Sequence, residues 1–353
     1  MFDYIIVGQG LAGTVLGLTL LKKGKSVLFV NDESRESASA VSAGIFNPIT
    51  GKRMVKTWKA EQLFPFLLSF YKEVESFLKI SIVREIPIYK PFSSTFEQNE
   101  WMRKSHEQHY DSFIDTNPGE KPYTSSIINP AGGFETKQSG TIDVPAMIIA
   151  FRAYLIEKRI YINAPFPISP ALENEMEMNT FKAKKIIFCE GAFAAQNALF
   201  SWLPFSPVKG EILEIEIENF TPEAILNKNG FLLPMKNKKF LVGSTYEKEY
   251  TDDKPSEKGA EKIKENLNSF FKLPYIKVGQ KAGIRPATRD RRPIIGMHPE
   301  QATIGIFNGL GTKGVSLAPF FAQQFYAFLE EGKTLDPEVA IDRFSSFYPG
   351  IHN

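Results

Sequence analysis

A glycine-rich turn near the start of the chain joins a short apolar segment to a longer one. Residues 3–7 read Asp-Tyr-Ile-Ile-Val, residues 8–13 read Gly-Gln-Gly-Leu-Ala-Gly, and residues 16–21 are mostly apolar. The first segment is typical of a buried strand and the last of a helix. In such a unit the glycines allow a tight turn, an approach of the backbone to a pyrophosphate, and close helix–strand packing. The pattern predicts a dinucleotide site at the start of the helix, formed by Gly8, Gly10, Leu11, Ala12 and Gly13.

The residue that would bind the ribose of this dinucleotide departs from the usual pattern. An acidic side chain is expected roughly 20 residues after the first glycine, at the end of the second strand. Gly24 and the apolar residues 26–30 predict a helix end and that strand, so its end falls at Asn31, with Asp32 next. Either side chain can bond a ribose hydroxyl. We slightly favour Asp32, because it carries the charge that strengthens the contact and repels a 2′-phosphate.

Composition narrows the class of protein. The chain has 353 residues, 43% of them hydrophobic and 23% charged, which suits a globular enzyme of two connected domains. A net charge of +2 argues against a protein whose main task is binding nucleic acid. The single cysteine, Cys189, excludes an internal disulfide and a cysteine-based metal cluster. The four histidines form no metal-ligand pattern, so we expect no metal site.

The hydropathy pattern also bears on localisation. No apolar run approaches the roughly 18–20 residues of a membrane span. The first predicted strand starts at residue 3, which leaves no room for a signal peptide before it. We therefore expect a cytoplasmic protein.

The predicted elements alternate between two types. Apolar residues at helical spacing, among them Phe66, Phe70, Val74 and Phe77, predict a helix over residues 61–79. Further helices are predicted at 144–158, capped by Asp143, at 256–272, and at 315–330, ended by Gly332; strands are predicted at 160–162 and 183–189, within 82–92 and 123–136, and as a hairpin at 231–234 and 240–243. This order predicts an α/β (α+β) fold, in which a Rossmann-like nucleotide domain is interleaved with an antiparallel-sheet domain.

A second glycine-rich segment lies near the carboxyl end of the chain. Arg285 stands in the Pro-stiffened stretch Gly-Ile-Arg-Pro, and glycines at 309, 311 and 314 lead into the last predicted helix. The free backbone N–H groups of such a helix start suit a group that gains negative charge. The N1–C2=O edge of a reduced flavin is such a group.

Six motifs occur in the same order as in the D-amino-acid-oxidase-like family of FAD-dependent oxidoreductases, which the chain resembles along nearly its whole length. This family includes glycine oxidase, sarcosine oxidase and D-amino-acid dehydrogenase. The motifs are residues 8–13, the small-residue loop 37–44, the strand end 186–192, the stretch Pro207–Glu211, residues 242–247, and the Gly-Ile-Arg-Pro segment with its glycine-rich tail. The resemblance implies an FAD-binding domain of residues 1–81, 141–211 and 281–353, and a substrate-binding domain of residues 82–140 and 212–280.

The resemblance also implies roles for individual residues. Arg285 matches the family's arginine that pairs with the substrate carboxylate, although it could instead satisfy loop carbonyls. Lys313 matches the place where the family's backbone meets the flavin pyrimidine, and could favour the reduced anionic flavin or merely face solvent. Tyr246 and Tyr250 could cover the site, bond the substrate or simply pack. The further implied FAD contacts are Ser42, Ala43, Gly44, Gly191, Gly309, Gly311, Thr312 and Gly314.

The flavin is expected to be bound non-covalently. Cys189 lies within an apolar strand, and the small-residue loop 37–44 holds no histidine. The implied reaction oxidises the C–N bond of a small amine or amino acid, of glycine, N-methyl or D-amino-acid type, by hydride transfer to flavin. Such chemistry requires alignment more than a strong protein base. The electrons could pass to O2, a quinone or another carrier.

Three other functions stay open at this stage. The tail Gly-Leu-Gly-Thr-Lys-Gly resembles that of the oxidase domain in a bifunctional tRNA-modifying enzyme, which removes a carboxymethyl group from a secondary amine. The basic residues that could then face phosphates are Lys22, Lys23, Lys25, Lys52, Arg53 and Lys56. An NAD-dependent dehydrogenase would leave the second glycine-rich helix start unexplained. A flavoprotein without turnover is the third alternative.

Overall fold

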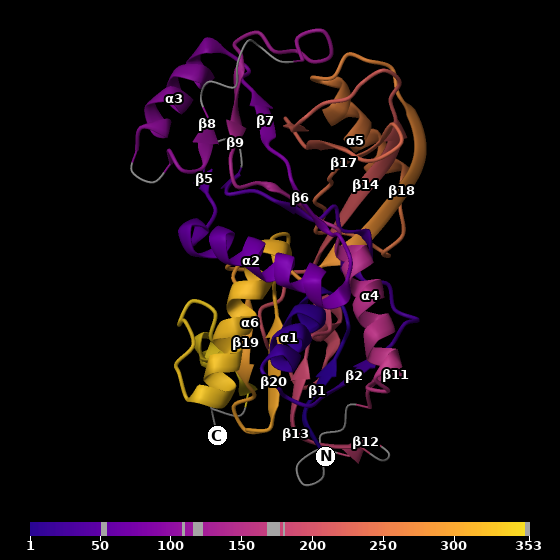
Figure 1. Cartoon of the computed structure of the whole chain (residues 1–353), viewed down its shortest axis with the longest axis vertical. Helices are drawn as coiled ribbons and strands as arrows, with labels where there is room; N and C mark the ends of the chain where they lie inside the picture. The colour runs from indigo at the N-terminus through magenta and orange to yellow at the C-terminus, as the bar shows by residue number, and fades with distance from the viewer. Residues whose placement is uncertain (51–54, 108–109, 116–122, 168–176, 179–180, 350–353) are drawn as a thin grey trace.

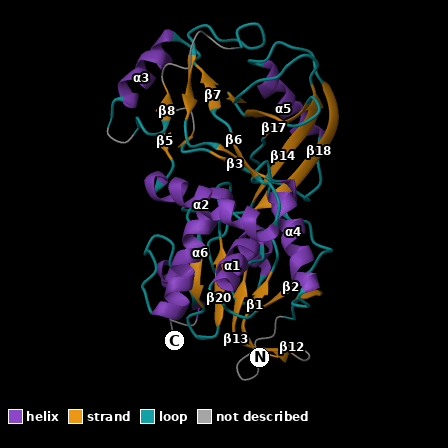
Figure 2. Cartoon of the chain, in the orientation of Figure 1, coloured by secondary structure: helices purple, strands orange, loops and turns teal. Residues whose placement is uncertain are grey.

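The computed structural model describes residues 1–50, 55–107, 110–115, 123–167, 177–178 and 181–349. Figure 1 shows two layers of structure stacked along the long axis of the molecule. Parallel strands covered by helices form the lower part, and a larger, mainly antiparallel sheet forms the upper part (Figures 1 and 2). The predicted α/β (α+β) class is confirmed.

The lower sheet has seven strands and is mostly parallel. Its order is β11 (Tyr161–Asn163), β2 (Val27–Asn31), β1 (Phe2–Val7), β13 (Phe181–Phe188), β20 (Ile304–Asn308) and β19 (Ile294–Met297), and β12 (Glu177–Met178) pairs with β13. The pairs from β11 to β20 are parallel, whereas β19 runs antiparallel to β20. The predicted βαβ start of the chain therefore supplies the centre of this sheet.

Side-chain alternation along β1 explains how this sheet is buried on both faces. Tyr4 and Ile6 belong to the core beneath the helices, whereas Ile5 and Val7 belong to the core on the opposite face. The helices on the first face are α1 (Leu11–Lys22), α2 (Ala60–Leu78), α4 (Val144–Glu157) and α6 (Gly314–Glu331). The opposite face is covered by short 3₁₀ segments and loops, among them η2 (Gly191–Gln196) and η3 (Ile341–Phe347).

The sequence-predicted helices of this layer are confirmed, with one correction. Asp143 caps α4, since its carboxylate accepts a hydrogen bond from the Ala146 N–H at 3.0 Å. Gly332 ends α6 with a φ of 66°. Of the apolar residues whose spacing predicted α2, Phe70 and Val74 are buried, whereas Phe77 is 39% exposed. The residues that α2 buries are Ala60, Leu63, Phe64, Leu67, Phe70, Tyr71 and Val74.

The upper sheet has eight strands. Its order is β18 (Ile276–Arg285), β14 (Val208–Glu216), β17 (Lys239–Gly243), β16 (Phe231–Pro234), β15 (Ile225–Asn227), β7 (Ile88–Pro91), β9 (Gly133–Thr136) and β8 (Ile114–Asp115). Only β15 and β7 pair in parallel. The predicted hairpin is β16–β17, with Leu233 opposite Leu241. Helix α5 (Glu257–Asn268) covers one face of this sheet and ends earlier than predicted.

Two small sheets and a short helix complete the fold. The first small sheet contains β3 (Ile45–Phe46), β10 (Gly140–Ile142) and β6 (Val83–Glu85), and the second contains β4 (Ile49–Thr50) and β5 (Val55–Lys56). Helix α3 (Thr95–Ser105) lies at the far end of the upper part (Figure 1). The large upper sheet combines strands from two distant parts of the chain, in keeping with the predicted interleaving. The boundaries at residues 82, 141, 212 and 281 stay predictions. Among the described residues, no helix is both long and apolar enough to cross a membrane.

Candidate active site

The turn between β1 and α1 depends on two glycines that touch. Gly8 has a φ of 97°, in the region that favours glycine, and a β-carbon there would lie 2.6 Å from the Cys189 carbonyl oxygen. A β-carbon on Gly13 would lie 1.9 Å from the Gly8 carbonyl oxygen. Both contacts are far too short, so a side chain at Gly8 displaces the turn from the end of β13, and one at Gly13 displaces α1 from the turn.

Gly10 differs from its two neighbours, because its missing side chain leaves space. A β-carbon there would meet only the hydroxyls of Ser39, at 3.3 Å, and Ser37, at 3.4 Å. No side chain caps the start of α1. Instead, the Leu11 N–H donates to the Ser39 hydroxyl at 3.0 Å, from the 3₁₀ segment η1 (Ala38–Val41). Exposed backbone, helix N–H groups and hydroxyls are the donors that a pyrophosphate requires, so these residues fit the phosphates of a dinucleotide.

The two candidate ribose residues make different contacts. The Asn31 carboxamide oxygen accepts the Gln9 N–H at 2.8 Å, and its amide donates to the Tyr161 hydroxyl at 3.2 Å. Asp32 instead accepts from the hydroxyl and N–H of Ser34, and these hydrogen bonds lower the pKa of its carboxyl group. Asn31 thus ties the glycine turn to β2 and β11, whereas the Asp32 carboxylate is held by its own loop. The assignment of the ribose contact stays a prediction.

The small-residue loop links the two large sheets. Gly44 has a φ of 66°, and a β-carbon there would lie 1.8 Å from the Ile142 carbonyl oxygen. The Ser42 hydroxyl accepts the Gly44 N–H at 3.1 Å, and Ala43 packs against the apolar cluster of the upper sheet. On β18, a β-carbon at Gly283 would lie 3.0 Å from the α-carbon of Ala38 in η1. The segment predicted to contact FAD therefore lies between the glycine turn and the upper sheet.

The second glycine-rich loop meets the first. A β-carbon on Gly314, at the start of α6, would lie 2.8 Å from the Leu11 side chain at the start of α1. Gly309 and Gly311 have φ values of 74° and 55°, which let the chain turn into the helix, while Thr312 between them and α6 is exposed. The Gly191 carbonyl accepts from the Asn308 amide at 2.9 Å. The predicted cofactor residues at 8–13, 191 and 309–314 are thus gathered at the carboxyl ends of the parallel strands, where ligands bind in such sheets.

Lys313 is a half-buried cation among neutral partners. Its ammonium group lies 3.2 Å from the Thr57 hydroxyl and 3.5 Å from that of Thr50. Burial lowers the pKa of Lys313, and the nearby Arg292 and Arg291 lower it further. In the part of the chain that the structure describes, the hydrogen-bond partners of the Lys313 ammonium are hydroxyls. An anion bound beside it would offset the unfavourable burial of its charge. The two threonines were not predicted, because they follow no spacing rule.

We expect Lys313→Met to shift the reduction potential of bound flavin to a more negative value. With Lys313 in its predicted place beside the flavin pyrimidine, loss of this partly buried cation removes about 1–3 kcal/mol of stabilisation from the reduced anion, or roughly 20–60 mV for a two-electron couple. Equilibration with a reference dye measures this shift. Lys333→Met, beyond the other end of α6, is the control, because Lys333 is exposed and pairs with Glu331. Equal potentials for both variants would contradict a flavin contact for Lys313.

Arg285 lies at the end of β18 with its guanidinium over the neighbouring strand. It donates to the Thr245 carbonyl at 3.1 Å and to the Ser244 hydroxyl at 2.9 Å. A β-carbon on Gly210 would lie 1.9 Å from one guanidinium nitrogen, so only glycine leaves room for this position. Burial lowers the pKa of Arg285, an effect that Tyr246 opposes. Among the described residues its hydrogen-bond partners are neutral, which leaves the cation able to bind a carboxylate. Tyr246 itself is 52% exposed.

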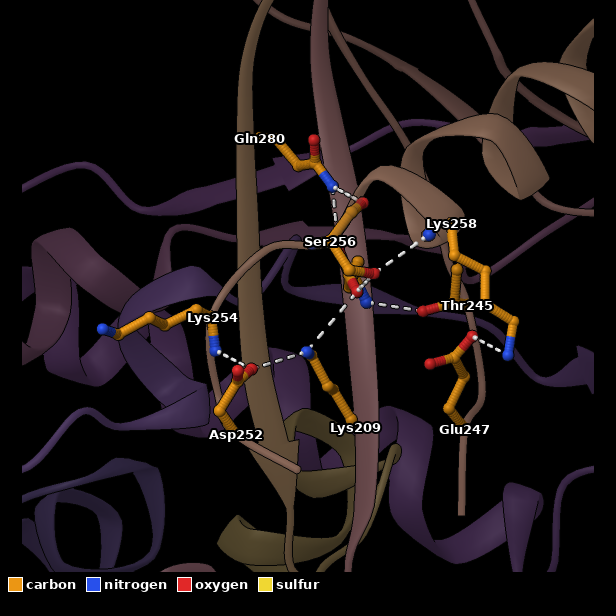
Figure 3. A network of polar contacts seen from close by, with 10 residues as sticks. Lys209, Thr245, Glu247, Asp252, Lys254, Ser256, Lys258 and Gln280 are labelled. Atoms are coloured by element: carbon orange, nitrogen blue, oxygen red, sulfur yellow. Dashed lines mark hydrogen bonds and ion pairs between the residues drawn. The ribbon is translucent and has the colours of Figure 1, made fainter. Parts of the chain in front are cut away.

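A buried polar network holds the other side of the same strands (Figure 3). Glu211 is fully buried and accepts from the Ser256 hydroxyl at 2.7 Å, the Ser256 N–H at 2.9 Å and the Gln280 amide at 2.7 Å. The Lys209 ammonium lies between Glu211, at 3.7 Å, and Asp252, at 3.2 Å. The Glu211 N–H also donates to the Thr245 hydroxyl at 2.9 Å. The network thereby fixes Thr245, whose carbonyl holds Arg285.

We expect Glu211→Gln to lower the free energy of unfolding by about 1–3 kcal/mol. Lys209 loses its buried counter-charge, and the neutral amide replaces a carboxylate that accepts from the Ser256 N–H and the Gln280 amide. Urea unfolding, followed by far-UV circular dichroism, measures the change. The control is Glu247→Gln, because Glu247 pairs with an exposed Lys258 at 3.9 Å. Equal losses in the two variants would show that the buried network adds no stability.

Sequence comparison decides between the cofactors. The family model DAO, described as FAD dependent oxidoreductase, matches residues 3–326. This chain belongs to the DAO family. It is an FAD-dependent oxidoreductase of the amine- and amino-acid-oxidising class, and the match argues against the NAD-dependent alternative.

Relatives of this DAO-family chain are glycine oxidases and tRNA-modifying enzymes. The glycine oxidase of Bacillus licheniformis is 22% identical over 351 residues, 90% of each chain. The glycine oxidase of Pseudomonas putida is 29% identical over only 150 residues, 40% of each chain. The tRNA 5-methylaminomethyl-2-thiouridine biosynthesis bifunctional protein of Campylobacter concisus is 24% identical over 87% of this chain and 48% of its own length.

A solved structure has the same fold. Glycine oxidase from Geobacillus kaustophilus superposes with a TM-score of 0.77 at 20% sequence identity, covering 95% of this chain and 96% of that chain. At this identity the likeness concerns the fold alone. Its extent over nearly both chains confirms that a Rossmann-like layer and an antiparallel sheet are combined here as in glycine oxidase.

Proposed function

We propose that this protein oxidises the C–N bond of a small amine that carries a carboxylate, of glycine, N-methyl or D-amino-acid type. The observation that carries the proposal is Arg285, a cation with neutral partners on the sheet that faces the cofactor residues. The glycine oxidases among the relatives support the same substrate class. A carboxylate bound to the guanidinium would fix the α-carbon and nitrogen of the substrate in one orientation.

Different residues of this site would bind the cofactor and the substrate. The backbone and hydroxyl donors around Gly10 and Ser39 would hold the phosphates of FAD, and the loop at Lys313 would hold the pyrimidine end. When bound, the flavin supplies the two-electron acceptor for the oxidation. Arg285 would orient the substrate carboxylate, with Thr245 and Ser244 keeping the guanidinium in place. Tyr246, which is half-exposed, would cover or bond the substrate. The substrate amine must lose its proton, for which this arrangement offers solvent rather than a buried base.

The test is an anaerobic titration of the purified protein, followed in its visible spectrum. Glycine, sarcosine, proline and a panel of D-amino acids are added in turn. Bleaching of the flavin by one of these amines is the expected result. A yellow protein that none of them bleaches would contradict the proposed substrate class and would favour a flavoprotein without turnover. Admission of O2, or of a quinone, to the reduced protein then identifies the electron acceptor.

A second candidate is oxidation of a carboxymethylaminomethyl-type group on modified tRNA. The match to the bifunctional tRNA-modifying protein favours it, since that match covers most of this chain. The contacts of the basic residues argue against binding of tRNA phosphates. Lys22, Lys25 and Lys56 pair with carboxylates, and Lys23 lies over the Tyr326 ring; Lys52 and Arg53 lie outside the described residues. RNA binding with a steep salt dependence would support this candidate, and no binding at low salt would exclude it.

A further inference from the structure

The sheet face that carries Arg285 continues from the guanidinium into apolar side chains. Arg285 is paired with Val208, and Gly210 and Ile212 follow on the same face of β14. The guanidinium lies over Gly210, where a β-carbon would come within 2.2 Å of three of its atoms. Ile212 is the next side chain on this face, about 7 Å further along the strand. A group bound to Arg285 therefore approaches Ile212, whose side chain is 8% exposed.

Ile212 is joined to an aromatic ring across the sheet. In the register, Ile212 lies opposite Gly243, and Gly243 lies opposite Phe231. A β-carbon on Gly243 would lie 2.8 Å from the Ile212 side chain and 3.0 Å from the Phe231 ring, so these two side chains meet over the glycine. Phe231 is only half-buried, and it can therefore contact a bound molecule.

The row beyond Ile212 is apolar, and the charged pair nearest to it is neutral in sum. Leu241 and Leu233 form the next row of the same face, and Leu241 is half-buried. Lys281, opposite Ile212, pairs at 2.6 Å with Glu214, the next residue of that face on β14. The side chains that follow Arg285 along this face, Ile212, Phe231 and Leu241, are consequently hydrocarbon.

We propose that the substrate carries an apolar aliphatic or aromatic substituent next to its carboxylate, received by Ile212, Phe231 and Leu241, so that glycine is a poor substrate. This inference rests on the proposed function, because it takes Arg285 as the carboxylate site. A carboxylate on the guanidinium directs the substituent of its α-carbon along the face. Burial of hydrocarbon against hydrocarbon then adds to the affinity.

The experiment measures carboxylate binding to the flavin-loaded protein, from the change that each ligand causes in the visible flavin spectrum. The probes are acetate, butanoate, hexanoate and benzoate, with glycolate and succinate as polar and charged counterparts. We expect the affinity to rise from acetate to hexanoate by at least tenfold, since each buried methylene can add up to about fourfold. Succinate should bind more weakly than butanoate.

Two variants locate the effect. Phe231→Ala should reduce the gain from acetate to hexanoate about fivefold and leave acetate affinity within twofold; Phe231→Leu should lose mainly the benzoate preference. Val242→Ala is the matched control, because Val242 lies one residue from Gly243 on the opposite face, in the core under α5. The control should change no ligand preference.

The outcomes separate this inference from the proposed function. Clear binding with equal affinity along the series, or tightest binding of acetate or succinate, would overturn the apolar site and leave Arg285 as the carboxylate site. A gain that Phe231→Ala and Val242→Ala reduce equally would also overturn it. Failure of every carboxylate to bind would remove the anion site itself, and with it both proposals.

Discussion

Replacing Arg285 with alanine is expected to slow the oxidation of carboxylate-bearing amines about 100- to 1,000-fold, or about 3–4 kcal/mol in kcat/KM. The expected loss is this large because the proposed function makes the guanidinium the cation that binds the substrate carboxylate, and its present partners are a carbonyl and a hydroxyl. Stopped-flow reduction of the flavin under anaerobic conditions measures it. The affinity for FAD should stay within twofold, since the Arg285 side chain extends over β14 to Ser244 and Thr245, and the nearby contact with the second glycine-rich loop is made by the Pro286 backbone, whose carbonyl accepts the Gly311 N–H at 3.2 Å.

Two further variants make the result specific. Arg285→Lys keeps the positive charge but cannot bind a carboxylate in a bidentate way, and we expect a rate between those of the alanine variant and the parent. Arg289→Ala removes an exposed arginine four residues along the chain, and the rate should not change. Both comparisons use the same substrate and the same flavin readout.

Different failures would have different meanings. If Arg285→Ala loses its flavin, the guanidinium serves the fold rather than the substrate, and the argument for a carboxylate substrate falls. If the rate is unchanged while flavin is retained, the carboxylate is bound elsewhere. A loss restricted to kcat, with an unchanged KM, would show that Arg285 aligns the substrate without contributing to its ground-state binding.

The fold could be predicted largely because its signals are local. The helix at α4 follows from Asp143 as a cap, and the end of α6 follows from Gly332. The hairpin β16–β17 follows from two apolar runs around a polar turn. These features depend on a few neighbouring residues, which a sequence shows directly.

Local periodicity predicted the helix α2 but does not show which of its apolar residues are buried. Phe66 and Phe77 fit a helical spacing with Phe70 and Val74, yet Phe77 is exposed. Phenylalanine is so frequent in this chain, with 30 residues, that more than one face of a helix can appear apolar. The packing of α6 against α2 selects the face, and that contact is not visible in the sequence of either helix.

Only the parts of the candidate site that contain glycines at close backbone contacts could be predicted from the sequence. Gly8 and Gly13 permit close approaches of backbone to backbone that no other residue allows, and Gly314 lies against the Leu11 side chain, so these positions indicate where the two glycine-rich segments come close. Gly210 was seen only as part of a family motif, although it leaves room for the Arg285 guanidinium from a different strand. The hydroxyls of Thr50, Thr57 and Ser244 were missed, since a hydroxyl becomes informative only once its partner is in place.

The variant Gly10→Val is expected to fold and to lose FAD. Gly10 has a φ of −77° and a ψ of −165°, an extended conformation that valine adopts readily. The new β-carbon would meet only the two serine hydroxyls, at 3.3 and 3.4 Å. The valine methyl groups would then occupy the space in front of the helix N–H groups, where the pyrophosphate must approach. We expect a colourless protein whose dissociation constant for FAD rises more than about 100-fold.

The measurement combines two readings on one preparation. Quenching of FAD fluorescence reports binding, and far-UV circular dichroism during thermal unfolding reports the fold. The melting temperature of Gly10→Val should fall to that of the parent freed of FAD, and no further, because the variant lacks only the stabilisation that the ligand gives.

Gly13→Ala provides the contrast that decides the assignment. Its β-carbon would lie 1.9 Å from the Gly8 carbonyl oxygen, so this single methyl group must displace α1 from β1. We expect Gly13→Ala to melt below the FAD-free parent, whereas the larger valine at Gly10 does not. If Gly10→Val retains FAD, the pyrophosphate does not approach this turn. If both variants unfold alike, Gly10 is required for packing rather than for FAD binding, and the pyrophosphate site must lie elsewhere than in front of α1.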